Sequence, residues 1–118
     1  MKRRWSEMDV LIVDEISMLR PQVLDSLEEF VRVIRGSDAP MGGILLILCG
    51  DFLQLPPVKC TQLTFTAKCW QRLFPEQEQM QTLQGVHRQS KDLEYHAFLN
   101  RVRYGYLDVA RDIRLLLE

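Results

Sequence analysis

The amino-acid sequence predicts an α/β fold in which a parallel sheet is flanked by helices. Two apolar runs, Val10–Val13 and Ile44–Leu48, lack the alternation of a half-exposed strand. Such runs are typical of strands that are buried on both faces of a parallel sheet. Residues 21–35, between them, carry an apolar stripe with helical spacing. Strand, helix and strand form a βαβ unit, so we expect two parallel strands joined by a right-handed crossover.

The predicted helix over residues 21–35 has recognisable ends. Its apolar stripe comprises Val23, Leu24, Leu27, Phe30, Val31 and Ile34, which lie on one face of a helix. Pro21 suits the first helical position and Gly36 suits the stop after the last turn. Arg20 would be a poor N-cap, because it offers no short side-chain oxygen to the first N–H groups.

The remainder of the chain gives weaker signals. The segment Gly50–Pro57 closes with two prolines and is expected to be a loop. The patterns predict short or medium helices over residues 67–73, 91–104 and 108–117, and a third strand over residues 80–83. Because no repeat, low-complexity segment or linker interrupts the sequence, residues 1–118 are expected to form one domain or part of one.

Composition excludes several classes of protein. The chain has 118 residues, a net charge of −1, 47% hydrophobic residues and 26% charged residues, which is ordinary globular usage. Residues 1–59 hold 7 basic and 9 acidic side chains, and residues 60–118 hold 8 and 7. Neither half is a basic module, so nucleic-acid binding cannot be argued from charge. The longest apolar run, Gly43–Cys49, is far shorter than the ~20 residues of a membrane span.

The first residues and the cysteines bear on the compartment. Lys2, Arg3 and Arg4 precede no apolar segment, so no secretory signal is expected. These side chains are interpreted as a solvated terminus, with a nuclear signal or a phosphate contact as alternatives that three charges are too few to decide. Cys49, Cys60 and Cys69 match no zinc or redox spacing. Cys49 ends an apolar run and is expected to be a small buried hydrophobe. A scattered, odd set of cysteines favours a reducing compartment over secretion.

Two acids follow the first predicted strand. Asp14 and Glu15 would stand at the carboxyl end of a buried parallel strand, where ligands bind in open α/β sheets. An apolar strand that ends in Asp-Glu has the form of a Walker B motif. In such a motif the aspartate holds Mg²⁺ and the glutamate polarises the attacking water. The alternative is a pair of acids in a turn, favoured by the dipole of the following helix.

Polar groups also follow the second and third predicted strands. Gln54, in the segment Gly50–Gln54, would stand at the same sheet edge and could sense a γ-phosphate. Arg88 follows residues 80–83 and could stabilise transferred charge, although an exposed arginine before a helix is the simpler interpretation. Ser17 is interpreted as a turn or capping hydroxyl, since no histidine lies near it in the sequence. His87 and His96 are too far apart to form a metal pair.

Together these segments resemble the Pif family of superfamily 1B DNA helicases, which move 5′ to 3′ on single-stranded DNA. The resemblance rests on Leu11–Met18, Leu48–Val58 and His87–Gln89, with further similarity at residues 98–105. It implies a RecA-like P-loop NTPase domain that uses ATP and Mg²⁺. It implies that Asp14 holds Mg²⁺, that Glu15 activates water, that Gln54 senses the γ-phosphate and that Arg88 contacts it.

The sequence departs from the family pattern in one important respect. The phosphate-binding Gly-x-x-x-x-Gly-Lys-[Ser/Thr] does not occur, and Gly-Lys is found nowhere in these 118 residues. The backbone nest and lysine that cradle phosphates are therefore missing. The chain resembles the C-terminal part of a first RecA-like domain, without its phosphate-loop strand and without a second motor domain. The isolated chain is expected to be inactive and poorly soluble, because uncovered strand edges associate.

The resemblance implies part of an ATP-dependent helicase that acts in DNA repair, recombination and telomere maintenance. Single-stranded DNA would be the partner of the intact protein. Its location would be the nucleus or mitochondrion of a eukaryote, or otherwise the cytoplasm. One alternative is a catalytically inactive remnant or binding module, which stop codons in the DNA upstream of this segment would favour over an in-frame Gly-x-x-x-x-Gly-Lys-[Ser/Thr]. A RecD-like ATPase is a further alternative, against which the match at Gly50–Val58 argues.

Overall fold

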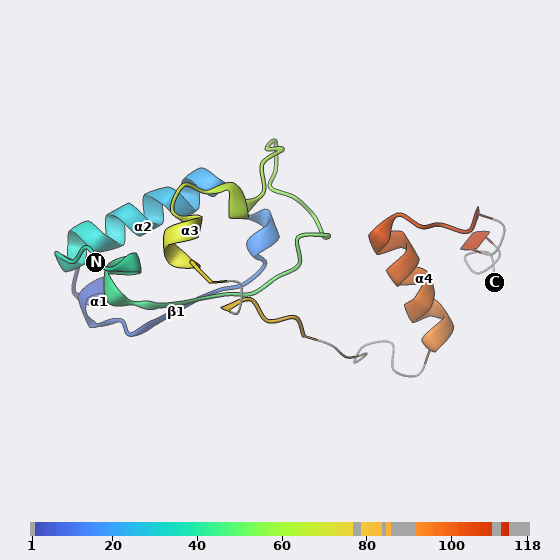
Figure 1. The fold of residues 1–118 in the computed structure, drawn as a ribbon, viewed down its shortest axis with the longest axis horizontal. Helices are drawn as coiled ribbons and strands as arrows, with labels where there is room; N and C mark the ends of the chain where they lie inside the picture. Colours follow the sequence, from blue (N-terminus) through green and yellow to red (C-terminus); the bar gives the residue numbers. More distant parts are fainter. Residues whose placement is uncertain (1, 77–78, 84, 86–91, 110–111, 114–118) are drawn as a thin grey trace. The chain divides into compact units, whose positions relative to one another are not determined.

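The computed structural model describes residues 2–76, 79–83, 85, 92–109, 112 and 113. The chain divides into two compact units, residues 1–80 and 81–118, which are described separately (Figure 1). The elements of the first unit are α1 (Lys2–Glu7), β1 (Val10–Val13), the 3-10 turn η1 (Ile16–Met18), α2 (Pro21–Arg35), η2 (Pro40–Gly43), β2 (Leu45–Leu48), η3 (Thr64–Thr66) and α3 (Trp70–Leu73).

The βαβ unit predicted from the sequence is present. β1 and β2 pair in parallel, with a register that runs from Val10 opposite Leu45 to Val13 opposite Leu48. Helix α2 lies between them in the chain and begins and ends at the predicted residues. Pro21 occupies its first turn, and Gly36 adopts the left-handed conformation at its C-cap, with φ of 59°. Arg20 is the N-cap and makes no side-chain capping hydrogen bond.

The core lies between α2 and one face of the sheet (Figure 1). Leu24 and Val31 of α2 are fully buried, as predicted for the helical stripe, and Met41 and Ile44 join them. Leu11 of β1 and Leu46 of β2 pack against this cluster from the sheet. Helix α1, which the sequence interpretation missed, adds Trp5 to its edge.

The prediction that both strands are buried on two faces is wrong for the described residues. Exposed and half-buried residues alternate along β1 and β2. Ile12 is 64% exposed and Leu45 is 59% exposed, on the face opposite α2. Cys49 continues this alternation beyond β2 and is exposed rather than buried. The apolar runs therefore include residues on the sheet face opposite α2, which no described element of residues 1–80 covers.

Two weaker predictions need correction. The short helix α3 spans Trp70–Leu73 rather than residues 67–73, and the 3-10 turn η3 precedes it. Residues 80–83, predicted as a third strand, form no strand. Among the described residues the sheet consists of β1 and β2, and residues 80–83 lack the packed face that fixes a short strand in a sheet. Their side chains are correspondingly exposed, Leu83 to 97%.

The second unit contains α4 (Leu93–Tyr104), within the predicted range 91–104. Asp92 caps it by accepting a hydrogen bond from the Tyr95 N–H at 2.9 Å. Arg101 pairs with the buried Asp112 through two of its nitrogens. Val109, Asp112 and Ile113 are helical, and the remainder of the predicted helix 108–117 lies partly outside the described residues. No described helix has the length and hydropathy needed to cross a membrane.

Candidate functional site

The carboxyl ends of β1 and β2 meet at one edge of the sheet. The Cys49 N–H donates to the Val13 carbonyl at 2.8 Å, which extends the ladder past the end of both strands. The Ile16 N–H then donates to the Cys49 carbonyl at 2.9 Å. These two bonds hold the chain after β1 against the chain after β2. Asp14–Glu15 and Gly50–Gln54, the two segments for which the sequence predicted a role in chemistry, therefore lie side by side.

Asp14 and Glu15 form an exposed acidic turn at this edge. Glu15 adopts a left-handed conformation, with φ of 52° and ψ of 45°. That conformation costs a non-glycine residue about 1–2 kcal/mol. The Asp14 Oδ1 accepts a hydrogen bond from the Glu15 N–H at 2.9 Å. The turn directs the next residues, Ile16 and Ser17, into the protein, while the two carboxylates stay accessible to a ligand.

Gly50 lets the second loop approach the first. It has a φ of 148°, and a Cβ placed on it would lie 2.8 Å from the backbone nitrogen of Ile16. The same Cβ would lie 3.4 Å from the carbonyl carbon of Glu15. No side chain fits at that separation from a backbone atom. The absence of a side chain at position 50 is thus what brings the two loops together.

Gln54 is oriented by Asp51. The Asp51 carboxylate accepts from the Leu53 N–H at 3.0 Å and from the Gln54 Nε2 at 3.3 Å. The Asp51 carbonyl accepts from the Gln54 N–H at 3.0 Å. Asp51 therefore folds the loop into a turn and holds the exposed Gln54 amide on one side of it. The sequence interpretation gave no role to Asp51, although an Asp in a loop often accepts from the backbone N–H two residues later in an Asx turn, as it does here with Leu53.

Asp14 fits the role of a magnesium ligand only in combination with other oxygens. Its carboxylate is exposed and hard, as Mg²⁺ requires. Among the described residues, no group of three or more His, Cys, Asp or Glu side chains could hold a metal ion. Mg²⁺ is usually bound by one or two carboxylates together with water and substrate phosphates. The donor set at this edge suits that arrangement rather than a metal site built from protein alone.

Two other predicted residues have different outcomes. Arg88 lies outside the described residues, so the structure does not relate it to this edge. Ser17 lies in the turn η1, as predicted, but it caps no helix. It is 1% exposed, and its hydroxyl has no hydrogen-bond partner among the described residues.

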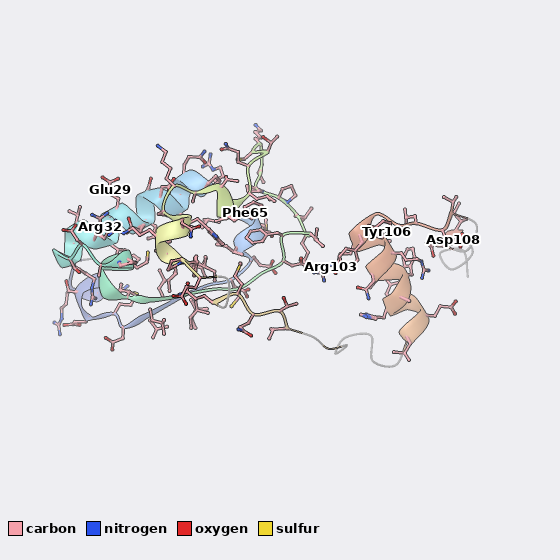
Figure 2. All side chains as sticks on the ribbon, viewed as in Figure 1. Glu29, Arg32, Phe65, Arg103, Tyr106 and Asp108 are labelled. Carbon is pink, nitrogen blue, oxygen red and sulfur yellow. The ribbon has the colours of Figure 1, made fainter. Side chains whose placement is uncertain are left out.

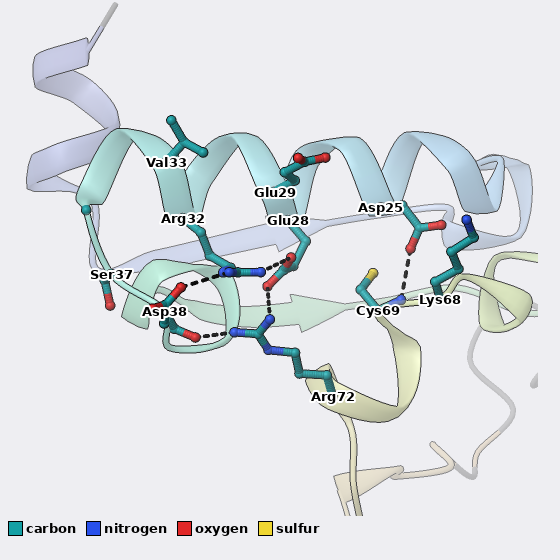
Figure 3. Close-up of a pocket in the computed structure, with 11 residues that line it drawn as sticks. Asp25, Glu28, Glu29, Arg32, Val33, Ser37, Asp38, Lys68, Cys69 and Arg72 are labelled. Atoms are coloured by element: carbon teal, nitrogen blue, oxygen red, sulfur yellow. Dashed lines mark hydrogen bonds and ion pairs between the residues drawn. The ribbon is translucent and has the colours of Figure 1, made fainter.

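A second charged region, which we call the α2–α3 cleft, was not predicted from the sequence. It is lined by Asp25, Glu28, Glu29, Arg32, Asp38, Lys68, Cys69 and Arg72, among others, and has a volume of about 580 Å³. Glu28 is 4% exposed and lies 3.6 Å from Arg32 and 3.8 Å from Arg72. Arg32 also pairs with Asp38 at 2.8 Å, as Figure 3 shows. Opposite charges thus lie within ion-pair distance across this cleft, although the Glu28 Oε1 and the Arg32 Nε have no hydrogen-bond partner among the described residues.

Asp25 and Cys69 interact at the other end of the α2–α3 cleft. The Asp25 carboxylate accepts from the Cys69 N–H at 2.9 Å. Burial opposes ionisation of Asp25, but hydrogen bonds from Cys69 outweigh it and lower the pKa of the carboxyl. Burial, followed by the neighbouring Asp25, raises the pKa of the Cys69 thiol to about 12. Cys69 therefore remains a neutral thiol and is no nucleophile.

Comparison with known proteins identifies relatives over most of the chain. A family model described as PIF1-like helicase matches residues 1–111. The ATP-dependent DNA helicase PIF1 of Saccharomyces cerevisiae is 45% identical over 111 residues, which cover 90% of this chain and 13% of the yeast protein. The ATP-dependent DNA helicase RRM3 of the same species is 42% identical over 120 residues and covers 95% of this chain.

Solved structures agree with this match. The Pif1 helicase from Bacteroides, in complex with ADP-AlF3 and ssDNA, aligns with a TM-score of 0.81 and 30% identity over 98% of this chain. The Pif1 helicase from Candida albicans aligns with a TM-score of 0.76 and 36% identity over 86%. This chain covers 28% and 23% of those two proteins. It thus spans well under a third of the relatives that it matches.

Proposed function

This chain belongs to the PIF1-like helicase family, and from that premise we propose that it supplies the hydrolytic side of the ATP site of a DNA helicase. The observation that carries the proposal is the convergence of two loops at one sheet edge. The Asp14–Glu15 turn and the Gly50–Gln54 loop are joined there by the bond from Ile16 to Cys49 and by the close approach at Gly50. Ligands of open α/β sheets bind at such an edge.

Three side chains have separate roles in the proposed hydrolysis of ATP. Asp14 would hold Mg²⁺, which when bound neutralises charge on the phosphate oxygens. The Glu15 carboxylate accepts a proton from the water that attacks the γ-phosphorus, and the bond to the β–γ bridging oxygen breaks to give ADP and phosphate. The Gln54 amide, held by Asp51 at 3.3 Å, contacts the γ-phosphate and reports its loss.

Arg88 would complete the site by stabilising the transferred phosphoryl group. The planar guanidinium fits two phosphate oxygens, whereas an ammonium does not. We therefore expect Arg88→Lys in a working motor to reduce hydrolysis while DNA binding without nucleotide stays similar. ATPase assays and DNA-binding titrations measure the two quantities. Loss of DNA binding with unchanged turnover per bound enzyme would make Arg88 a DNA contact instead.

The remaining parts of the machine would come from other segments. We propose that residues 1–118 form the C-terminal part of a first RecA-like domain. A Gly-x-x-x-x-Gly-Lys-[Ser/Thr] segment and a second motor domain would complete it. Single-stranded DNA is the proposed track, since the Bacteroides relative was solved with ssDNA. Movement 5′ to 3′, work in DNA repair, recombination and telomere maintenance, and action in the nucleus or mitochondrion are further parts of this proposal.

The proposal is tested with a chimera in which this chain replaces the matching segment of yeast PIF1. Glu15→Gln keeps the size of the side chain and removes the charge that accepts the proton. We expect ATP binding to persist while DNA-stimulated phosphate release falls by about 10²-fold or more. Binding of a fluorescent ATP analogue and release of phosphate are measured on the same samples.

Glu29→Gln is the matched control, because Glu29 is an exposed glutamate of α2 within the α2–α3 cleft and away from the strand ends. It should leave phosphate release unchanged. Near-normal turnover of the Glu15→Gln chimera would remove Glu15 from the hydrolytic role. A parent chimera that binds ATP and DNA but releases no phosphate would favour an inactive remnant.

A further inference from the structure

The turn η3 contacts both loops of the candidate site, although it belongs to none of the motifs found in the sequence. Its first residue, Thr64, is fully buried. The Thr64 Oγ1 lies 2.6 Å from the Ile16 carbonyl and 2.6 Å from the Leu19 carbonyl. Ile16 directly follows Glu15, so this hydroxyl ties η3 to the end of the acidic turn.

The next residue, Phe65, contacts the other loop. Its ring lies 5.0 Å from the ring of Phe52, centroid to centroid, in an edge-to-face arrangement with an interplanar angle of 89°. Phe52 is two residues before Gln54 and packs also against Trp70, at 6.2 Å. The Phe65 side chain is labelled in Figure 2. Two adjacent residues of one turn thus touch the two segments on which the proposed chemistry depends.

Other contacts between the loops lie closer to the sheet. The bond from Ile16 to Cys49 and the packing at Gly50 fix where the loops begin. Asp51 closes the second loop upon itself. Beyond Gly50, the Gly50–Gln54 loop contacts other elements through the Phe52 ring, which packs against Phe65 and Trp70.

We propose that η3 is a positioning element, in which Thr64 and Phe65 together set the placement of Gln54 relative to Glu15. This inference rests on the proposed function, for which both side chains must reach one phosphate. Aromatic edge-to-face pairs favour a defined geometry beyond the burial of their area. A displacement of about 1 Å in a reacting group can lower a rate on the order of 10²-fold.

The test compares two equivalent aromatic pairs in the yeast chimera. Phe65→Leu removes the ring that contacts Phe52. Phe30→Leu removes the ring that contacts Trp5, at 5.8 Å and 86°, far along α2 from the strand ends. Phe65 is 44% exposed and Phe30 is 42% exposed, and the Phe65 ring lies in addition 6.4 Å from the Trp70 ring. We expect Phe65→Leu to lower kcat on the order of tenfold with little change in KM for ATP, and Phe30→Leu to leave both unchanged.

Conservative variants separate positioning from general stability. Phe65→Tyr keeps the ring and should restore kcat. Thr64→Ser keeps the hydroxyl and should be active, whereas Thr64→Val has a similar shape without a donor and should lower kcat. Equal losses in Phe65→Leu and Phe30→Leu, or no rescue by tyrosine and serine, would overturn the positioning role.

A second measurement does not depend on hydrolysis. In the yeast chimera, Phe65→Leu should speed hydrogen–deuterium exchange in both loops, residues 14–19 and 50–54, whereas Phe30→Leu should change neither loop. Faster exchange confined to the immediate neighbours of Phe65 would contradict the proposal. Glu15→Gln distinguishes this failure from that of the proposed function. Loss of turnover in Glu15→Gln with full activity in Phe65→Leu would reject only the role of η3.

Discussion

The sheet edge at the carboxyl ends of β1 and β2, which we call the strand-end edge, and the α2–α3 cleft both contain charged side chains. The two regions use charge in different ways. In the cleft, Glu28 is buried between Arg32 and Arg72, and Asp38 pairs with Arg32. At the edge, Asp14, Glu15 and Gln54 are exposed, and their hydrogen bonds go to their own loops. The backbone around them is strained and tightly packed, with Glu15 left-handed and Gly50 against Ile16.

This difference teaches how to separate structural charge from chemical charge. Charges that neutralise one another hold helices together and leave little capacity for a ligand. Charges kept accessible by a costly backbone conformation retain that capacity, and strain of this kind clusters at functional sites. The α2–α3 cleft is therefore not the better candidate for the active site. Variants at the strand ends should therefore change turnover, whereas variants in the α2–α3 cleft should change stability.

The largest effect is expected from Gly50→Ala. The new Cβ would lie 2.8 Å from the Ile16 nitrogen, so the two loops must separate. We expect ATP turnover of the yeast chimera to fall on the order of 10²-fold, as for other displacements of catalytic groups. Phosphate release under saturating ATP and DNA measures the effect.

Gly43→Ala is the control for backbone strain alone. Gly43 also has positive φ, 86°, but a Cβ there meets nothing within 4 Å. It should cost stability without reducing turnover. Similar loss of turnover in both glycine variants would mean that strain, rather than the close approach of the two loops, controls activity.

A smaller effect is expected from Glu28→Gln in the α2–α3 cleft. It leaves Arg72 and Arg32 without their shared carboxylate. We expect the free energy of unfolding to fall by about 1–2 kcal/mol, less than for a fully buried pair because both arginines are partly exposed. Urea unfolding of the chain, followed by tryptophan fluorescence, measures this change. Turnover per folded molecule of the chimera should not change; a large loss of turnover would place the cleft in the reaction.

The smallest effect concerns Cys69 and pH. Its pKa in the folded chain, about 12, lies above the ordinary value of 9.0. The folded state therefore holds the thiol proton more tightly, and this contribution to stability is complete below pH 9 and is lost as pH rises through 12. Cys69→Ala should remove this part of the loss of folding stability at alkaline pH.

At pH 8 the exposed Cys49 should react with iodoacetamide while Cys69 stays unmodified until unfolding, as peptide mass spectrometry would show. Equal labelling of both thiols would contradict the burial of Cys69.

The sequence predicted the parts of the fold that depend on local patterns. The limits of α2 follow from Pro21 and Gly36, and the parallel pairing follows from two apolar runs around a helix. It failed where the outcome depends on neighbours. Residues 80–83 have strand-like composition but no packed face, and Cys49 is exposed because no described element of residues 1–80 covers its face.

The candidate site shows the same limit. Asp14, Glu15 and Gln54 were recognisable from motif type and position after a strand. Thr64 was not, because its role depends on distances between segments that are far apart in sequence, whereas Asp51 contacts residues two and three positions later and was overlooked. Thr64 lies 45 to 48 residues from the carbonyl groups that it contacts. No periodicity or motif in one sequence reveals such a contact.

Iron-directed cleavage of the yeast chimera tests most directly whether the strand-end edge, rather than the α2–α3 cleft, holds the metal of the ATP site. Fe²⁺ replaces Mg²⁺ in the presence of ADP, and peroxide then generates radicals that cut the backbone near the ion. Peptide mass spectrometry locates the cuts. We expect nucleotide-dependent cleavage within residues 13–16 and 49–51, reduced by Asp14→Asn. Cleavage concentrated within residues 25–38 and 68–72, and unaffected by Asp14→Asn, would contradict this account.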